Sequence, residues 1–282
     1  MKKRIITAIV AILIFAPICI FSEYIIYPIA MSILAAVGVF EIAKCIGFHK
    51  KLVLTIPAYI VALALPILRF FLSNKSKPNS VFMLYAMASV FVLLVFCLGY
   101  VMFNKNKYKL SDVLTFFALS VYVIGCFVAM VIVRYTELVP QQGLYMFPIM
   151  FLSAWICDTF AYFTGRLIGK HKLIPDISPK KTIEGAIGGI VFTFIAMMGY
   201  GCLIKFAFHY DGISFVHLAI FGIVLPVVSQ IGDLIASCIK RQYNIKDFGN
   251  VFPGHGGVID RFDSPMLVAP VICVINAIFA LF

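Results

Sequence analysis

Charged residues are scarce in this 282-residue chain. Asp, Glu, Lys and Arg together make up 12% of it, whereas soluble globular domains contain about 25%. Apolar residues account for 63%, and the mean hydropathy is +1.05. A soluble globular protein is excluded by this composition, and the repeated apolar runs of about 20 residues predict an integral membrane protein.

The chain also lacks a cleavage site and paired cysteines. The first apolar run, residues 5–21, follows Met-Lys-Lys-Arg, but no small-residue cleavage site comes after it. We therefore interpret it as a retained helix and not as a signal peptide. The eight cysteines are scattered mostly through apolar runs, which fits small buried side chains better than disulfides or a zinc site.

The apolar runs define the fold class. We predict an all-α, polytopic integral membrane protein with about nine transmembrane helices. No internal repeat of the kind that many transporters contain is visible. The expected spans are residues 5–21, 24–46, 52–72, 80–103, 111–133, 144–165, 184–207, 212–236 and 264–282.

The basic residues predict the orientation of these spans. Of the 23 Lys and Arg residues, 18 lie in the N-terminus and the even-numbered loops, and five lie in the other loops. By the positive-inside rule the N-terminus and both polar loops are cytoplasmic, and the C-terminus is outside. The net charge of +11 is thus mostly a topology signal with some attraction for anionic lipid, and it does not indicate a nucleic-acid partner. We expect a multi-pass protein of the cell membrane.

The acidic residues divide the chain functionally. Eight of the twelve Asp and Glu residues lie beyond residue 140. We therefore predict that residues 1–140 form scaffold helices and that residues 141–282 form a catalytic region with two cytoplasmic polar loops.

The densest charges lie in residues 237–263, which read SCIKRQYNIKDFGNVFPGHGGVIDRFD. Inserting a charged side chain into the membrane costs about 2.5 to 3.5 kcal/mol of free energy, so a membrane protein has little structural use for so many charges. Cations and carboxylates beside a glycine-rich loop therefore indicate a site for phosphate and metal. Ser229, Asp233 and Ser237 form one polar stripe if the eighth helix continues this far. The loop 253–257 can bring backbone N–H groups close to an anion.

Oxygen ligands without paired Cys or His favour a hard cation, above all Mg²⁺. We predict metal ligands at Asp233, Asp260 and Asp263, with a second cation as a further option. Asp233 could instead cap a helix or pair with Lys240. Asp263 is equally compatible with a cap at the start of the ninth helix, since Ser264 and Pro265 follow it.

Two neighbouring residues allow two interpretations each. His255, alone in the glycine loop, either donates to a phosphate or braces the loop. Asp247, beside Lys246, fits the orientation of a cation better than metal binding.

A second polar loop follows the sixth span and reads DTFAYFTGRLIGKHKLIPDISPKKTIEGAIGG from residue 158 to residue 189. Asp158 shares a helix face with two later polar residues of this segment. Ser178, Lys180 and Lys181 precede a helix expected to start near Ile183, and such a helix N-terminus can bind phosphate. The alternative is that the lysines only enforce cytoplasmic orientation.

These residues resemble the signature of the phosphatidate cytidylyltransferases, the CDP-diacylglycerol synthases of the bacterial type. The resemblance covers about residues 150–265, and the signature is filled without a gap by Ser237, Lys240, Arg241, Lys246, Asp247, Gly249, Phe252, Pro253, His255, Gly256, Gly257, Asp260, Arg261 and Asp263.

The resemblance implies that CTP and phosphatidic acid react at a lipid bilayer to give CDP-diacylglycerol and pyrophosphate, in a homodimer. Metal would bind at Asp233 and Asp260, with a second cation as a further option. The catalytic residues would be Lys240, Arg241, Lys246, Asp247, His255 and Arg261. The substrate-binding residues would be Ser178, Lys180, Lys181, Ser237, Gly256, Gly257 and Asp158.

Two other classes stay open at this stage. A polytopic transporter would also carry carboxylates, but it would place them at the midplane of broken helices. A CTP-dependent kinase of a lipid alcohol shares nucleotide, metal and membrane, and its products distinguish it: CDP and a phospholipid, in place of pyrophosphate and a cytidylylated lipid.

Overall fold

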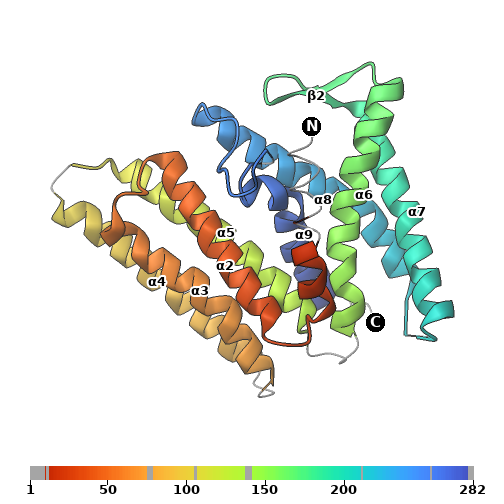
Figure 1. The fold of residues 1–282 in the computed structure, drawn as a ribbon, viewed down its shortest axis with the longest axis horizontal. Coiled ribbons are helices and arrows are strands. Elements are labelled where there is room, and N and C mark those ends of the chain that lie inside the picture. The colour runs from red at the N-terminus through yellow and green to blue at the C-terminus, as the bar shows by residue number, and fades with distance from the viewer. Residues whose placement is uncertain are drawn as a thin grey trace. The chain divides into compact units, whose positions relative to one another are not determined.

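The fold is almost entirely helical (Figure 1), which confirms the predicted class. The computed structural model describes residues 10, 13–74, 79–104, 107–136, 142–210, 212–254 and 256–278. Within these residues, eight helices are long and apolar enough to cross a membrane. The first expected span, residues 5–21, lies partly outside the described residues, and residues 13–20 of it are helical. The chain is thus a multi-pass membrane protein.

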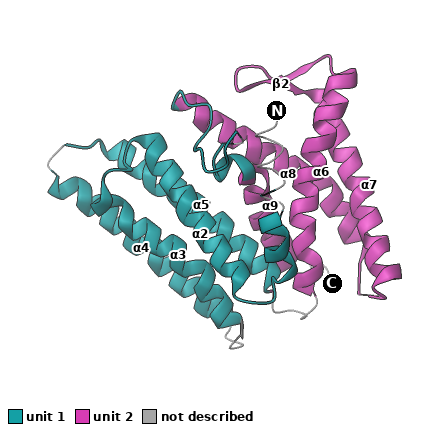
Figure 2. Cartoon of the chain, viewed as in Figure 1, with its two compact units in different colours: residues 1–135, 243–261 teal, residues 136–242, 262–282 magenta. Residues whose placement is uncertain are grey.

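Two compact units divide the chain, and Figure 2 colours them separately. Unit 1 comprises residues 1–135 and 243–261, and unit 2 comprises residues 136–242 and 262–282. The first boundary falls near the expected division at residue 140. The segment 243–261, however, groups with the N-terminal helices.

In the part of unit 1 that the structure describes there are four long helices. They are α2 (Ile26–Ile46), α3 (Leu52–Asn74), α4 (Asn79–Phe103) and α5 (Leu110–Arg134). Gly47 ends α2 in the left-handed conformation (φ 89°) that glycine adopts without strain. The hydroxyl of Tyr27 donates to the carbonyl of Met130 at 3.2 Å and so ties α2 to α5.

Unit 2 contains α6 (Gln142–Ile168), α7 (Ile183–Ala207), α8 (Phe215–Gln242) and most of α9 (Ile259–Ile278). Phe160 of α6 stacks on Phe192 of α7 with ring centroids 4.2 Å apart. Between these helices, β1 (Lys172–Ile174) pairs antiparallel with β2 (Ser178–Thr182). This hairpin was not predicted, because two strands this short carry too few residues for a period-two pattern.

The last two helices differ from their expected bounds. The eighth extends to Gln242, so the condition for a polar stripe is met. The ninth begins at Ile259, so the predicted start at Asp263 is wrong and Asp263 is no helix cap. The reason is that side-chain carboxylates accept the backbone N–H groups of residues 257–259, which satisfies the start of the helix before Asp263 is reached.

Candidate active site

Asp233 lies within the polar stripe of α8. Ser229, Asp233 and Ser237 follow at intervals of four residues on this continuous helix, so they share one face. The hydroxyl of Ser237 donates to Asp233 Oδ1 at 3.4 Å. The stripe therefore supports a carboxylate in a helix that is otherwise apolar.

Lys181 of β2 is the cation that meets Asp233. Its Nζ lies 2.5 Å from Asp233 Oδ2, and the two side chains are 24% and 28% exposed. Neighbouring residues of a strand point to opposite faces, so Lys180 points away from this pair and is exposed. Of the predicted group of Ser178, Lys180 and Lys181, it is thus Lys181 that reaches a carboxylate.

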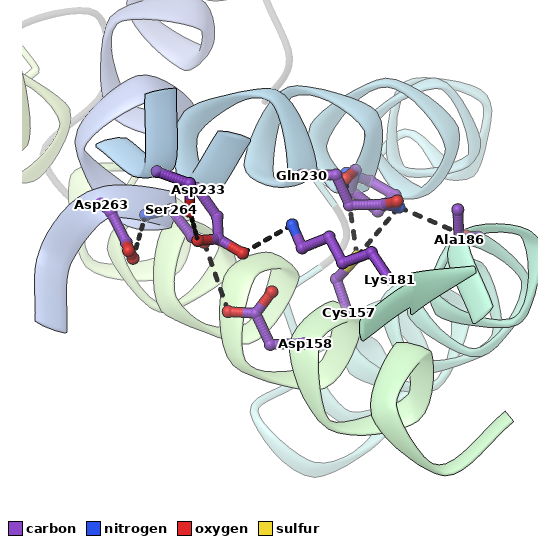
Figure 3. A network of polar contacts seen from close by, with 10 residues as sticks. Cys157, Asp158, Lys181, Ala186, Gln230, Asp233, Asp263 and Ser264 are labelled. Atoms are coloured by element: carbon purple, nitrogen blue, oxygen red, sulfur yellow. Dashed lines mark hydrogen bonds and ion pairs between the residues drawn. The ribbon is translucent and has the colours of Figure 1, made fainter. Parts of the chain in front are cut away.

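Two more carboxylates lie beside this ion pair, as Figure 3 shows. Asp158 Oδ2 on α6 accepts from the hydroxyl of Ser264 at 3.3 Å. Asp263 Oδ1 on α9 accepts from the backbone N–H of Ser264 at 2.9 Å. We refer to Asp158, Asp233, Asp263 and Lys181 as the carboxylate cluster.

The close approach of α8 and α9 depends on Gly232. A Cβ at this position would lie 2.6 Å from the carbonyl oxygen of Asp263 and 3.4 Å from the Cα of Ser264. Any side chain there would push the helices apart. Gly232 therefore lets Asp233, the next residue, lie near Asp263.

Gln230 of α8 links this helix to α6 and α7. Its Nε2 donates to the Sγ of Cys157 on α6 at 3.4 Å and to the carbonyl of Ala186 on α7 at 3.2 Å. Gln230 lies one turn before Asp233, and Cys157 directly precedes Asp158. The same contacts thus fix the backbone next to two of the carboxylates.

The hairpin that carries Lys181 is anchored at both ends. The hydroxyl of Thr182 caps α7 by accepting from the N–H of Gly185 at 3.1 Å, so the predicted helix start near Ile183 is confirmed. Glu184 lies 2.7 Å from the Nδ1 of His171.

At the turn, Arg241 Nε donates to the carbonyl of Ile177 at 3.4 Å. Arg241 is otherwise exposed, and Ser178 and Lys240 are half-buried. Lys240 follows Asp233 by seven residues on α8, so the two residues share one face of this helix.

The remaining signature residues lie in unit 1. Asp260 is buried, and its Oδ2 accepts from the N–H groups of Phe248 at 2.8 Å and Gly257 at 2.9 Å. Lys246, Asp247 and Arg261 are exposed, Gly256 is buried, and His255 lies outside the described residues.

The Gly257 N–H already has an acceptor in Asp260, so its contact with substrate remains a prediction. The same holds for metal binding by Asp260, whose Oδ2 braces the loop.

The donors of the carboxylate cluster suit a hard cation. Carboxylate and hydroxyl oxygens are the ligands that Mg²⁺ prefers. Within the part of the chain that the structure describes, no group of three His, Cys, Asp or Glu side chains is arranged to hold a metal ion. Mg²⁺ commonly takes only one or two protein carboxylates and completes its shell with water and substrate phosphate, so the residues fit such an ion.

Three residues that support the cluster or the signature loop (residues 246–261) were not identified from the sequence. Ser264 and Gln230 contribute through contacts between helices, which spacing along the chain does not reveal. Glu41 of α2 is fully buried and accepts from the N–H groups of Val258 and Ile259. Its signal was present, because a carboxylate within a membrane-spanning segment is a candidate for function by default.

Known proteins resemble this chain over nearly its full length. The profile of the "Cytidylyltransferase family" matches residues 2–279. A phosphatidate cytidylyltransferase of Staphylococcus saprophyticus is 34% identical over 272 residues, which cover 96% of this chain and 97% of that protein. A phosphatidate cytidylyltransferase of Bacillus subtilis is 30% identical over 280 residues, 99% of each chain.

Proposed function

Since the chain belongs to the cytidylyltransferase family, we propose that it transfers a cytidylyl group from CTP to phosphatidic acid and releases pyrophosphate. The observation that carries the proposal is the carboxylate cluster with Lys181, built on helices long and apolar enough to span a membrane. Such a site can accept a lipid headgroup while the acyl chains stay in the bilayer. The product is CDP-diacylglycerol, a precursor for phospholipid synthesis.

The reaction needs little acid–base catalysis. A phosphate oxygen of phosphatidic acid attacks the α-phosphorus of CTP, a new P–O bond forms, and the bond to the β-phosphate oxygen breaks with its electron pair on pyrophosphate. The nucleophile is already anionic near neutral pH. The work of the site is to bring two anions together in line and to stabilise the charge on the leaving group.

Asp233 and Asp263, with Asp158 beside them, would hold Mg²⁺. A bound Mg²⁺ supplies positive charge that neutralises phosphate oxygens and orients them. The support for this assignment is that the ligands offered are oxygens and that the three carboxylates lie beside one another in Figure 3.

Lys181, Lys240 and Arg241 would contact the phosphates. Lys181 contacts Asp233, and Lys240 and Arg241 lie at the end of α8. Lysine acts here as a point charge, and arginine can bind two phosphate oxygens at once. Lys246, Asp247, His255 and Arg261 remain predicted contributors from the rest of the signature.

Metal dependence tests this account. Purified protein in detergent should convert CTP and phosphatidic acid to a cytidylylated lipid in the presence of Mg²⁺. EDTA should abolish turnover, and added Mg²⁺ should restore it. Full activity in metal-free buffer would contradict the role given to the carboxylates.

A further inference from the structure

Glu41 is a buried carboxylate in an apolar helix. Its side chain is 1% exposed, and it lies within α2, which is long and apolar enough to span a membrane. A charge in such a place is costly unless hydrogen bonds compensate for it. Glu41 therefore requires partners, and those partners lie more than 200 residues further along the chain.

The partners are backbone N–H groups at the start of α9. Glu41 Oε1 accepts from Val258 at 2.8 Å, and Oε2 accepts from Ile259 at 2.9 Å. The first N–H groups of a helix have no partner within it, and the helix dipole favours negative charge there. Glu41 thus caps the start of α9 from a distant part of the chain, and Asp260 accepts from the preceding N–H of Gly257.

Two glycines of the signature make room for this carboxylate. A Cβ built at Gly249 or at Gly257 would overlap Glu41 Oε1. The next nearest atom is the Cδ of Glu41, which lies 2.9 Å from the Cβ built at Gly249 and 2.5 Å from the Cβ built at Gly257. Neither glycine has a positive φ, so it is the space taken by Glu41, and not the backbone conformation, that requires glycine here.

A second carboxylate braces the same loop. Asp260 Oδ2 binds the N–H groups of Phe248 and Gly257, which joins the two ends of the segment 248–257. Lys246 and Asp247, which are exposed, immediately precede this braced segment. Their placement relative to the start of α9 therefore depends on how firmly the loop is held.

We infer that Glu41 is a positioning residue for the reaction: it anchors the signature loop 246–261 to α2 through the start of α9. This inference rests on the proposed function for its catalytic consequence, but the anchoring itself does not. Helix α2 would then help to position catalytic residues, whereas the sequence predicted only a scaffold role for residues 1–140.

Amide hydrogen exchange tests the anchoring without any substrate. Glu41→Gln keeps the size of the side chain but replaces one of the two acceptors with a donor. Exchange of the peptide 257–262 in the detergent-solubilised protein should accelerate on the order of tenfold, as expected for a lost bond to a charged group. The peptide 170–182 of unit 2 should be unchanged.

Turnover tests the catalytic consequence. Glu41→Gln should lower kcat for CTP about tenfold or more at an unchanged amount of folded, membrane-inserted protein. Asp112→Asn is the matched control, because it removes an exposed carboxylate from the same unit and should retain wild-type kcat.

A double-mutant cycle separates positioning from general stability. Gly249→Ala should lower kcat in the wild type by pushing on Glu41. It should add little in a Glu41→Ala background, where the space is empty, so the two effects are not additive.

Accelerated exchange with reduced kcat and a non-additive cycle would support the inference. Unchanged exchange in Glu41→Gln would overturn the anchoring, and accelerated exchange with wild-type kcat would overturn the positioning role. If the wild-type protein itself failed to form cytidylylated lipid, the proposed function would fall, while the exchange result would still decide whether Glu41 anchors the loop.

Discussion

At the scale of single residues, the carboxylate cluster brings several negative charges close together. Asp158, Asp233 and Asp263 lie together, and the ammonium of Lys181 contacts Asp233. Several like charges at partial burial are costly unless cations compensate for them. A metal ion and the phosphates bound to it would supply that compensation.

The first prediction concerns the carboxylates. Asp233→Asn and Asp263→Asn should each lower kcat by about 10²- to 10³-fold, because each removes charge that would hold the metal. Steady-state kinetics on equal amounts of folded protein measures the effect. Asp176→Asn, which changes an exposed carboxylate of the hairpin, is the control. Near wild-type activity of both cluster variants would place the site elsewhere.

The second prediction concerns Lys181, whose charge could serve the reaction or only the orientation of the protein. Lys181→Gln combined with Ile174→Lys keeps the number of positive charges in the same loop. We expect this double variant to be inserted correctly but slowed by about 10²-fold, since the relocated charge no longer reaches Asp233. Recovery of wild-type turnover would show that Lys181 acts through topology alone.

At the scale of helices and strands, the site is made by close packing. Gly232 allows α8 and α9 to approach, Gln230 joins α8 to α6 and α7, and the hairpin carries Lys181 to Asp233. Helices α6, α8 and α9 and strand β2 each contribute one member of the carboxylate cluster.

The third prediction follows from this packing. Gly232→Ala should destabilise the protein by about 1 to 3 kcal/mol through overpacking and should also lower activity. Gly199→Ala in α7 is the control: no described atom lies within 4 Å of its added Cβ, and alanine favours a helix by about 1 kcal/mol over glycine. Thermal unfolding in detergent compares the two. Equal Tm values for both variants would contradict the close approach of α8 and α9.

The helices could be predicted from sequence, but the contacts between them could not. Apolar runs located the membrane-spanning helices, and the expected start of α7 near Ile183 is confirmed. The start of α9 was placed too late because its first N–H groups are capped by Glu41, a residue more than 200 positions away. Periodicity and local caps report on neighbours along the chain, whereas these contacts depend on the tertiary fold.

At the scale of the whole molecule, the two units share the signature. Residues up to Gln242 and from Phe262 belong to unit 2, and residues 243–261 belong to unit 1 with the N-terminal helices. The predicted homodimer and the second cation remain predictions at this scale.

The fourth prediction concerns orientation in the membrane, for which the distribution of Lys and Arg is the basis. In a background with all eight native cysteines replaced by alanine, Asp176→Cys in the hairpin should react with an impermeant thiol reagent only from the cytoplasmic side. Phe208→Cys, at the other end of α7, should react only from the opposite side. The reverse pattern would invert the proposed topology.

The central claim is that a cytidylyl group, and not a terminal phosphate, is transferred to a lipid phosphate. The most direct measurement supplies the purified protein with phosphatidic acid, Mg²⁺ and CTP labelled either at the α-phosphate or at the γ-phosphate. The account predicts that the α-label enters the lipid and that the γ-label appears in pyrophosphate. A γ-label in the lipid with the α-label in CDP would identify a kinase, and no label in any lipid would contradict the account altogether.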